Sequence, residues 1–185
     1  MNITDLPGEY LNGKKIHLLV PDLSRSQEMH QLIVNFSNLH REFLTWADDN
    51  SSEETVFSNM SIASKNFSED RDEYKFLIIN NHTNQLVGCI SLFIRHAQIP
   101  YFEIGYWLST QAMGYGFITE ACILVRDLAY HHLKSKRLEI RMARRNIRSS
   151  KLAERCGFYC EEILKNNRID GFGCLDDTCI YIYSK

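Results

Sequence analysis

The sequence predicts an α/β fold built on a mixed β-sheet of six to seven strands flanked by helices. The first observation is the order of elements: strand, two helices, three strands, helix, strand, helix and two strands. The second is the strand–helix–strand unit after the three-strand meander, because a crossover helix makes the strands that it joins parallel. The third is a length of 185 residues without repeat or linker, which predicts one domain over 1–185 with its core at about 12–183.

The N-terminal part is predicted to hold one strand and two helices. The strand is Lys15–Val20, and the helix after it has apolar residues at helical spacing between Met29 and Phe36. Ser51 and Glu54 have the spacing of a capping box, so we expect the second helix to begin at Ser51.

Three strands and a long helix are predicted for the middle of the chain. The strands are rich in β-branched and aromatic residues and lie at Tyr74–Ile79, Leu86–Ile94 and Tyr101–Leu108. The helix, from Ile118 to His132, has one continuous apolar stripe.

A strand, a short helix and a hairpin are predicted to complete the chain. Residues alternate over Arg137–Met142, which predicts a strand whose charged side chains form a solvated outer face. Asn146 is the expected N-cap of a helix that ends at Gly157. The last two strands, Tyr159–Leu164 and Thr178–Tyr183, are joined by a glycine-rich turn.

Composition and charge exclude several classes of protein. With 44% hydrophobic and 24% charged residues, the chain is neither disordered, collagen-like nor of low complexity. The 21 basic and 23 acidic residues give a net charge of −2, so no global charge favours nucleic acid. No apolar stretch is long enough for a membrane span, and Asp5 and Glu9 argue against a signal peptide. We therefore expect a cytoplasmic protein without a membrane partner.

The six cysteines are expected to be reduced, buried thiols. Cys156/Cys160 and Cys174/Cys179 are close in sequence, but their spacing is looser than that of zinc hooks and no histidine lies near them. We assign no metal.

The segment Gln111–Thr119 holds the most informative pattern, because it joins a strand to the amphipathic helix. Gly114 and Gly116 allow the backbone to turn sharply and to approach a ligand. The N–H groups from Met113 to Phe117 would then point outward at the positive end of the helix dipole, which suits a phosphate or pyrophosphate. The glycines by themselves are explained equally well by the geometry of the turn. A dinucleotide fingerprint would need a third glycine, and a P-loop would need Gly-Lys-Ser/Thr.

Two motifs and their spacing resemble those of a known family. The pattern Gln-x-x-Gly-x-Gly at 111–116, after a strand ending in Glu-Ile-Gly-Tyr-Trp-Leu (103–108), is similar to the acetyl-CoA pyrophosphate loop of the GNAT acetyltransferases. The run from Asn146 to Ser150, followed by Cys-Gly-Phe at 156–158, resembles the second GNAT signature. The strand phrase is especially similar to the Rim-type branch, which includes ribosomal-protein N-terminal acetyltransferases.

The resemblance implies a GNAT fold whose two central parallel strands, Tyr101–Leu108 and Arg137–Met142, splay apart. It implies acetyl-CoA as co-substrate and direct transfer of the acetyl group to a primary amine, with a protein or peptide N-terminus as acceptor. A small amine (a polyamine or an antibiotic) is an alternative acceptor, and a non-catalytic CoA-binding or RNA-binding module is an alternative function. The residues that it assigns to cofactor binding are Leu108, Gln111, Met113, Gly114, Tyr115, Gly116, Phe117, Ile118, Thr119, Asn146 and Ser149.

Two residues are candidates for catalysis by the same resemblance. Glu103 could remove a proton from the amine, often through water in related enzymes, or it could simply face solvent. Many relatives have a tyrosine seven residues after the asparagine, where this chain has Ala153. Ser149 instead matches the Rim-type serine and could hydrogen-bond the departing thiolate, or it could only cap the helix. Asn146 could cap the helix, contact the pantetheine arm, or do both. An oxyanion donor is expected at a backbone N–H near Leu108.

Charges are unevenly distributed along the chain. A basic run between Lys134 and Lys151 could be a solvated face, could bind RNA, or could reach CoA phosphates through Arg144, Arg145 and Arg148. We consider nucleic acid the less favoured partner. Acidic clusters lie in the region expected for the acceptor wall and could attract a cationic acceptor, although the helix dipole also favours carboxylates at a helix start. The clusters are Asp48/Asp49, Glu53/Glu54 and Glu69–Glu73. The sequence leaves a homodimer open.

Overall fold

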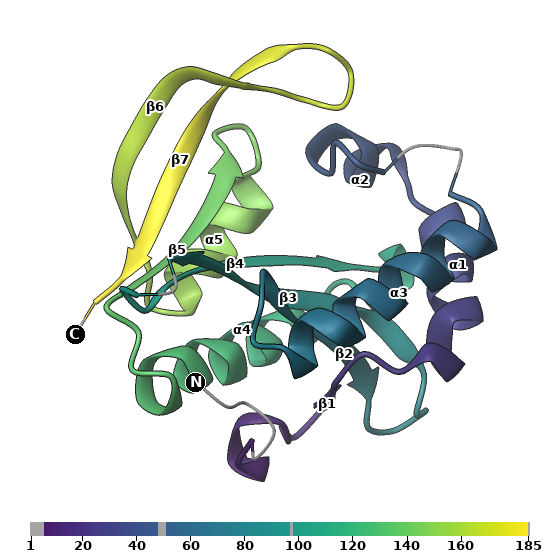
Figure 1. The fold of residues 1–185 in the computed structure, drawn as a ribbon. Helices are drawn as coiled ribbons and strands as arrows, with labels where there is room; N and C mark the ends of the chain where they lie inside the picture. The colour runs from purple at the N-terminus through teal and green to yellow at the C-terminus, as the bar shows by residue number, and fades with distance from the viewer. Residues whose placement is uncertain (1–5, 48–50, 97, 185) are drawn as a thin grey trace.

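The computed structural model describes residues 6–47, 51–96 and 98–184 (Figure 1). Its centre is a seven-stranded sheet in the order β1-β2-β3-β4-β5-β7-β6. The strands are β1 (Ile16–Leu19), β2 (Glu73–Asn80), β3 (Leu86–His96), β4 (Tyr101–Leu108), β5 (Arg137–Ala143), β6 (Tyr159–Ile169) and β7 (Leu175–Tyr183). The α-helices are α1 (Ser26–Val34), α2 (Asn38–Phe43), α3 (Glu53–Ser68), α4 (Phe117–Asp127) and α5 (Ile147–Arg155). The expected mixed α/β sheet is confirmed.

The β4–β5 pair is parallel, whereas the other neighbouring strands of the described sheet are antiparallel. The two strands pair only where Tyr101, Phe102 and Glu103 face 137, 138 and 139. Beyond Glu103 they separate, so the sheet opens in its middle as the resemblance implies. The crossover helix α4 joins these two strands, which explains why they run in the same direction.

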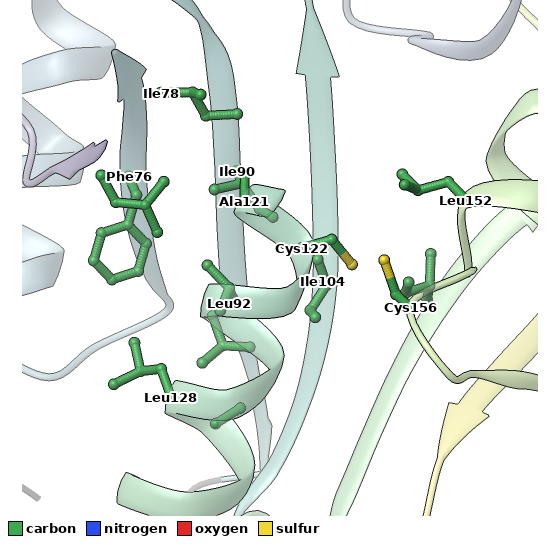
Figure 2. Close-up of a cluster of buried hydrophobic side chains, with 14 of the residues drawn as sticks. Phe76, Ile78, Ile90, Leu92, Ile104, Ala121, Cys122, Leu128, Leu152 and Cys156 are labelled. Atoms are coloured by element: carbon green, nitrogen blue, oxygen red, sulfur yellow. The ribbon is translucent and has the colours of Figure 1, made fainter. Parts of the chain in front are cut away.

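Alternating side chains of the strands build a core on each face of the sheet. On β2, Phe76 and Ile78 point toward α4, whereas Leu77 and Ile79 pack with residues of α1 and α3. Figure 2 shows the α4 side of this core, where Ala121 lies close to Ile90. The sheet is thus covered by α4 on one face and by α1 and α3 on the other (Figure 1).

The cysteines only partly match the expectation of buried thiols. All six are free, and Cys160 and Cys174 on the β6–β7 hairpin are exposed. The prediction of burial was wrong for these two, because β6 is an edge strand with most of its side chains in solvent. Figure 2 shows the sulfur atoms of Cys122 on α4 and Cys156 after α5 directed toward each other between the two helices.

Several element boundaries differ from those predicted. The N-cap of α3 is Ser52 rather than Ser51, because the Ser52 side chain accepts the N–H of Thr55 at 3.1 Å. The six-residue helix α2 was not predicted, since it is too short for a clear apolar period. Strands β6 and β7 extend beyond the predicted segments to Ile169 and back to Leu175.

The charged side of β5 is solvated at Arg137 and Arg141, whose side chains are 35% and 39% exposed, but not at Glu139. Glu139 is fully buried and accepts hydrogen bonds from Tyr101 Oη at 2.5 Å, Arg137 Nε at 3.0 Å and Arg141 Nε at 2.5 Å. The sequence prediction was wrong here because a buried carboxylate with partners on neighbouring positions produces the same alternation as an exposed strand.

Within the described residues, no helix is long and apolar enough to cross a membrane.

Candidate active site

A cavity of about 550 Å³, which we call the central cavity, lies beside the end of β4. Three segments far apart in the sequence surround it: α2, the β4–α4 junction and α5. Its lining residues are Leu39, His40, Phe43, Leu44, Tyr106, Trp107, Leu108, Met113, Gly114, Gly116, Ile118, Asn146, Arg148, Ser149, Lys151, Leu152 and Arg155.

The loop that precedes α4 has the backbone geometry that its glycines predict. Gly114 and Gly116 have φ angles of 89° and 81°, in the left-handed region, and Gly116 is the N-cap of α4. The N–H groups of the first helical turn have no intrahelical acceptor and point out of the helix end. One expectation was wrong: the N–H of Met113 is used within the protein, because it donates to the Thr110 carbonyl at 3.3 Å.

The edge of β4 directs a polar backbone group into the opening of the sheet. The N–H of Ser109 donates to the Val87 carbonyl on β3 at 2.8 Å. Because backbone groups alternate along an antiparallel strand, the N–H and carbonyl of Leu108 face away from β3 and toward the gap before β5. This is the direction that an oxyanion donor near Leu108 requires.

His40 fixes α2 to the same edge and was missed by the sequence analysis. Its Nδ1 accepts the N–H of Ser37 at 3.2 Å, so Nε2 carries the proton and donates to the Leu108 carbonyl at 2.6 Å. The ring is buried and stacks on Phe36 with centroids 4.4 Å apart. Since α2 itself was not predicted, no sequence pattern indicated this contact.

Ser149 and Asn146 have the local roles expected at the start of α5. The Asn146 side chain caps the helix by accepting the N–H of Ser149 at 3.1 Å. The Ser149 hydroxyl is hydrogen-bonded to the hydroxyl of Tyr106, and both residues line the central cavity. Tyr106 is a second residue that the sequence analysis missed, although it lies in the strand phrase that carried the resemblance.

The basic side chains of residues 144–155 separate into two groups. Arg144 binds Asp177 at 3.1 Å, and Arg145 binds Asp170 and Asp176 at 2.5 and 3.0 Å. These two arginines therefore bind the β6–β7 hairpin, and neither lines the central cavity. Three other basic side chains line the central cavity, namely Arg148, Lys151 and Arg155. Helical spacing places these three along the cavity side of α5.

Glu103 is neither exposed nor part of the cavity wall. Its side chain is 14% exposed and accepts Arg95 Nε at 2.9 Å, with Arg141 Nε at 3.7 Å. Burial raises the pKa of Glu103 above its usual value, although the two arginines act in the opposite direction. The residue lies at the last paired position of β4 and β5, where the strands begin to separate.

The tip of the β6–β7 hairpin contacts α2 (Figure 1). The N–H of Gly171 donates to the Glu42 carbonyl at 3.0 Å, and a Cβ at position 171 would overlap the carbonyl oxygen of Arg41. Because α2 is bound to β4 through His40 and β7 is paired with β5, these contacts close a frame around the opening of the sheet.

Among the described residues, the acidic clusters that suggested an acceptor wall do not line the central cavity. Glu53 and Glu54 lie in the first turn of α3, as the helix-dipole interpretation predicts. Arg71 pairs with Glu69 at 3.4 Å and with Asp72 at 3.6 Å, and none of these carboxylates lines the central cavity. Residues 48 and 49 lie outside the described residues.

The predicted cofactor residues divide between the central cavity and a second cavity of about 1030 Å³. Those that line the central cavity are Leu108, Met113, Gly114, Gly116, Ile118, Asn146 and Ser149. Gln111, Tyr115 and Phe117 line the second cavity, beside Lys15, whose Nζ donates to the Tyr115 carbonyl at 2.9 Å. Thr119 lines neither of the two. The part of the chain that the structure describes has no group of three or more metal-ligating side chains.

A protein-family model and a known protein both match most of this chain. Residues 22–159 match the model of the acetyltransferase (GNAT) domain. The Bacillus subtilis (strain 168) protein named "Probable N-acetyltransferase YjcK" is 33% identical over 165 residues, which cover 87% of this chain and 90% of that protein.

Two solved structures have the same fold. RimL, described as a ribosomal L7/L12 alpha-N-protein acetyltransferase in complex with coenzyme A, has a TM-score of 0.85 and 20% identity, covering 92% of this chain and 94% of that one. The microcin C7 self-immunity acetyltransferase MccE, in complex with acetyl-CoA and AMP, has a TM-score of 0.80 and 24% identity, covering 94% of each chain. The sheet that opens in its middle, the family match over most of the chain and the relative aligned along nearly its whole length together make this protein an N-acetyltransferase of the GNAT family.

Proposed function

We propose that the protein transfers the acetyl group of acetyl-CoA directly to the α-amino group of a protein or peptide. One observation carries the proposal: a single cavity is lined by the glycine loop before α4, by the open edge of β4 and by Ser149. We further propose that the whole chain is one catalytic domain, which works in the cytoplasm, where its six free cysteines stay reduced.

The backbone N–H groups and basic side chains around the central cavity are of the kind that binds acetyl-CoA. The outward N–H groups at the start of α4 and the side chains of Arg148, Lys151 and Arg155 suit a pyrophosphate and a further phosphate. The unpaired edge of β4 suits the amide groups of a pantetheine arm, with the Leu108 N–H available to a developing oxyanion. Asn146 is within the same wall and could bind the arm while it caps α5.

Amine activation is assigned to Glu103, acting through water, because burial raises its pKa and it lies where the two strands separate. Ser149 is assigned the role of donating a hydrogen bond to the departing sulfur of CoA. Direct transfer without an acyl-enzyme requires only that the amine and the thioester bind together in this cavity.

A slender acceptor is favoured by the frame that β4, α2, the hairpin and β5 form around the opening. Neighbouring structures include enzymes described as acetyltransferases of ribosomal L7/L12. A peptide N-terminus fits both considerations, because an extended chain presents its amine at a narrow end.

The acceptor is tested by measuring CoA release and product mass with four amines: a free peptide, the same peptide with a blocked N-terminus and an internal lysine, a polyamine and an aminoglycoside. We expect acetylation at the α-amino group of the free peptide. Turnover with the small amines alone would support the alternative acceptor. Tight CoA binding without turnover on any amine, or salt-sensitive RNA binding without CoA affinity, would contradict the enzymatic function.

The cofactor loop is tested by replacing Gly114 and Gly116 with valine. Because valine strongly disfavours positive φ, the N–H groups should turn away, and acetyl-CoA affinity should fall by about a hundredfold or more. Gly173→Val is a matched control, since Gly173 has a φ of 83° in open space on the distant hairpin. Retained affinity in the loop variant, with all three proteins folded by circular dichroism, would refute the assignment.

A further inference from the structure

A phenol and an alcohol are in direct contact in the wall of the central cavity. Tyr106 lies on β4 and Ser149 in the first turn of α5, and their hydroxyl groups are hydrogen-bonded to each other. Both residues line the cavity, and Ser149 is 9% exposed. The contact therefore joins the open edge of the sheet to the helix that carries the second family signature.

The chemistry of the two groups sets the direction of this hydrogen bond. A phenol is a much stronger acid than an aliphatic alcohol, and the alcohol oxygen is the better acceptor. Burial raises the pKa of Tyr106, so its proton stays on Oη at neutral pH. The geometry permits either hydroxyl to donate, and the greater acidity of the phenol favours Tyr106 as the donor and the Ser149 oxygen as the acceptor.

The orientation of Ser149 follows from this bond. A serine hydroxyl has one proton, and that proton cannot point toward a donor that already faces its oxygen. The backbone N–H of Ser149 is bound to Asn146 Oδ1 at 3.1 Å, which fixes the residue in the helix. The Ser149 proton must therefore point away from Tyr106, and the residue faces the cavity.

We propose that Tyr106 is a positioning residue for acetyl transfer, because its hydroxyl orients the Ser149 proton toward the departing sulfur of CoA. This inference rests on the proposed function and adds a residue to it. In the step concerned, the amine nitrogen bonds to the acetyl carbon, and the carbon–sulfur bond breaks with its electron pair going to sulfur. The proton that nitrogen loses on becoming an amide passes through water to Glu103, the proposed base, and the departing CoA leaves as the thiolate.

Neither hydroxyl proton has to leave its oxygen in this step. Ser149 donates a hydrogen bond to the sulfur as negative charge develops there, and Tyr106 strengthens that donor by donating to the same oxygen. If this hydrogen bond only held β4 and α5 together, its loss would lower the stability of the protein. Its effect on the transfer rate would then not depend on the leaving group.

The test varies the leaving group and the residue together. Tyr106→Phe, Ser149→Ala and the double variant are compared in single-turnover reactions with acetyl-CoA and with the acetyl selenoester of CoA. A selenol is far more acidic than a thiol, so its anion departs with little need for a donor. Single turnovers exclude product release from the measured rate.

With acetyl-CoA, we expect Tyr106→Phe to slow transfer on the order of tenfold to a hundredfold. With the selenoester, the loss should shrink to less than about threefold. Because Tyr106 acts through Ser149, the double variant should be no slower than Ser149→Ala. Tyr74→Phe is the matched control. Tyr74 lies on β2, is also buried, and its hydroxyl donates to Asp70 Oδ1 at 3.2 Å, so its loss should leave the leaving-group dependence unchanged.

Equal losses with both esters, additive losses in the double variant, or an unchanged rate in Tyr106→Phe would each overturn the inference. Thermal unfolding of every variant separates a rate effect from a loss of fold. If the wild-type protein transferred no acetyl group to any amine, the proposed function itself would fail, and this outcome is recognised before any variant is measured.

Discussion

Glu103 illustrates how one carboxylate responds to its position at the junction of two strands. Burial favours its protonated form, whereas Arg95 at 2.8 Å and Arg141 at 3.7 Å favour the ionised form. The pKa is raised, so burial outweighs the two ion pairs. A carboxylate in this state accepts a proton more readily than an exposed one.

Replacing Glu103 by glutamine should lower kcat/KM by about 10² if the residue is the general base. A base acts when ionised, so wild-type activity should fall as the pH drops through the raised pKa. The acid limb of the pH profile should disappear in the variant. Rates measured over a range of pH on both proteins test this.

Glu161→Gln is the control for Glu103→Gln, because Glu161 also accepts an arginine, Arg137 at 2.5 Å, but lies on the edge strand β6. Its pH profile should match that of the wild type. An unchanged profile in Glu103→Gln would remove the residue from the mechanism.

At the residue scale, the sequence predicts those features that depend only on neighbouring positions. The Asn146 cap and the left-handed glycines follow from rules that involve only neighbouring positions. His40 and Tyr106 were missed because their partners, Leu108 and Ser149, are 68 and 43 residues away. No periodicity in the sequence reports such a pairing.

Helix α4 is connected to the start of the chain by one side chain in its first turn. Glu120 accepts the backbone N–H groups of Lys14 at 2.7 Å, Lys15 at 2.9 Å and Ile16 at 3.1 Å. A Cβ at Gly13 would collide with this carboxylate, so the close approach requires glycine there. The helix that begins at the cofactor loop is therefore fixed to the edge of β1.

Glu120→Ala should lower the free energy of unfolding by about 1–3 kcal/mol, because three N–H groups lose a charged acceptor. Urea denaturation measures the change. Glu54→Ala in the first turn of α3 is the comparison and should change the free energy by less than about 1 kcal/mol. A smaller loss for Glu120→Ala than for Glu54→Ala would contradict the role of this contact.

At the scale of elements, the strands and long helices could be predicted because burial imposes a period on them. Strand β4 has the predicted bounds, Tyr101–Leu108. Helix α2 could not be predicted, since six residues span less than two turns. The C-terminal end of β6 and the N-terminal end of β7 were also missed; β6 is an edge strand with mostly exposed side chains, so no buried face imposes alternation on it.

The whole molecule is organised around a frame whose sides come from distant parts of the chain. Strand β4, helix α2, the β6–β7 hairpin and β5 enclose the opening of the sheet, and the contact at Gly171 completes it. The order of elements predicted the sheet but not this frame, because a hydrogen bond between a hairpin tip and a helix leaves no trace in either segment alone.

Gly171→Ala should move the hairpin away from α2, since the added Cβ would overlap the Arg41 carbonyl. We expect kcat/KM for a peptide acceptor to fall on the order of tenfold, with acetyl-CoA affinity unchanged. Isothermal titration and peptide kinetics separate the two effects. Gly173→Ala, two residues away in open space, should retain peptide kinetics closer to those of the wild type. If Gly171→Ala lowered acetyl-CoA affinity while Gly173→Ala did not, the proposal that the hairpin tip affects only the peptide acceptor would be contradicted.

The separation of β4 and β5 has a consequence for the sheet as a whole. Sheets ordinarily leave polar backbone groups without partners at their outer edges, whereas this one has an inner edge as well, at the centre of the molecule. An extended ligand lying there would act as an additional strand. If acetyl-CoA binds as proposed, its pantetheine arm would be the neighbour that β4 lacks beyond Glu103.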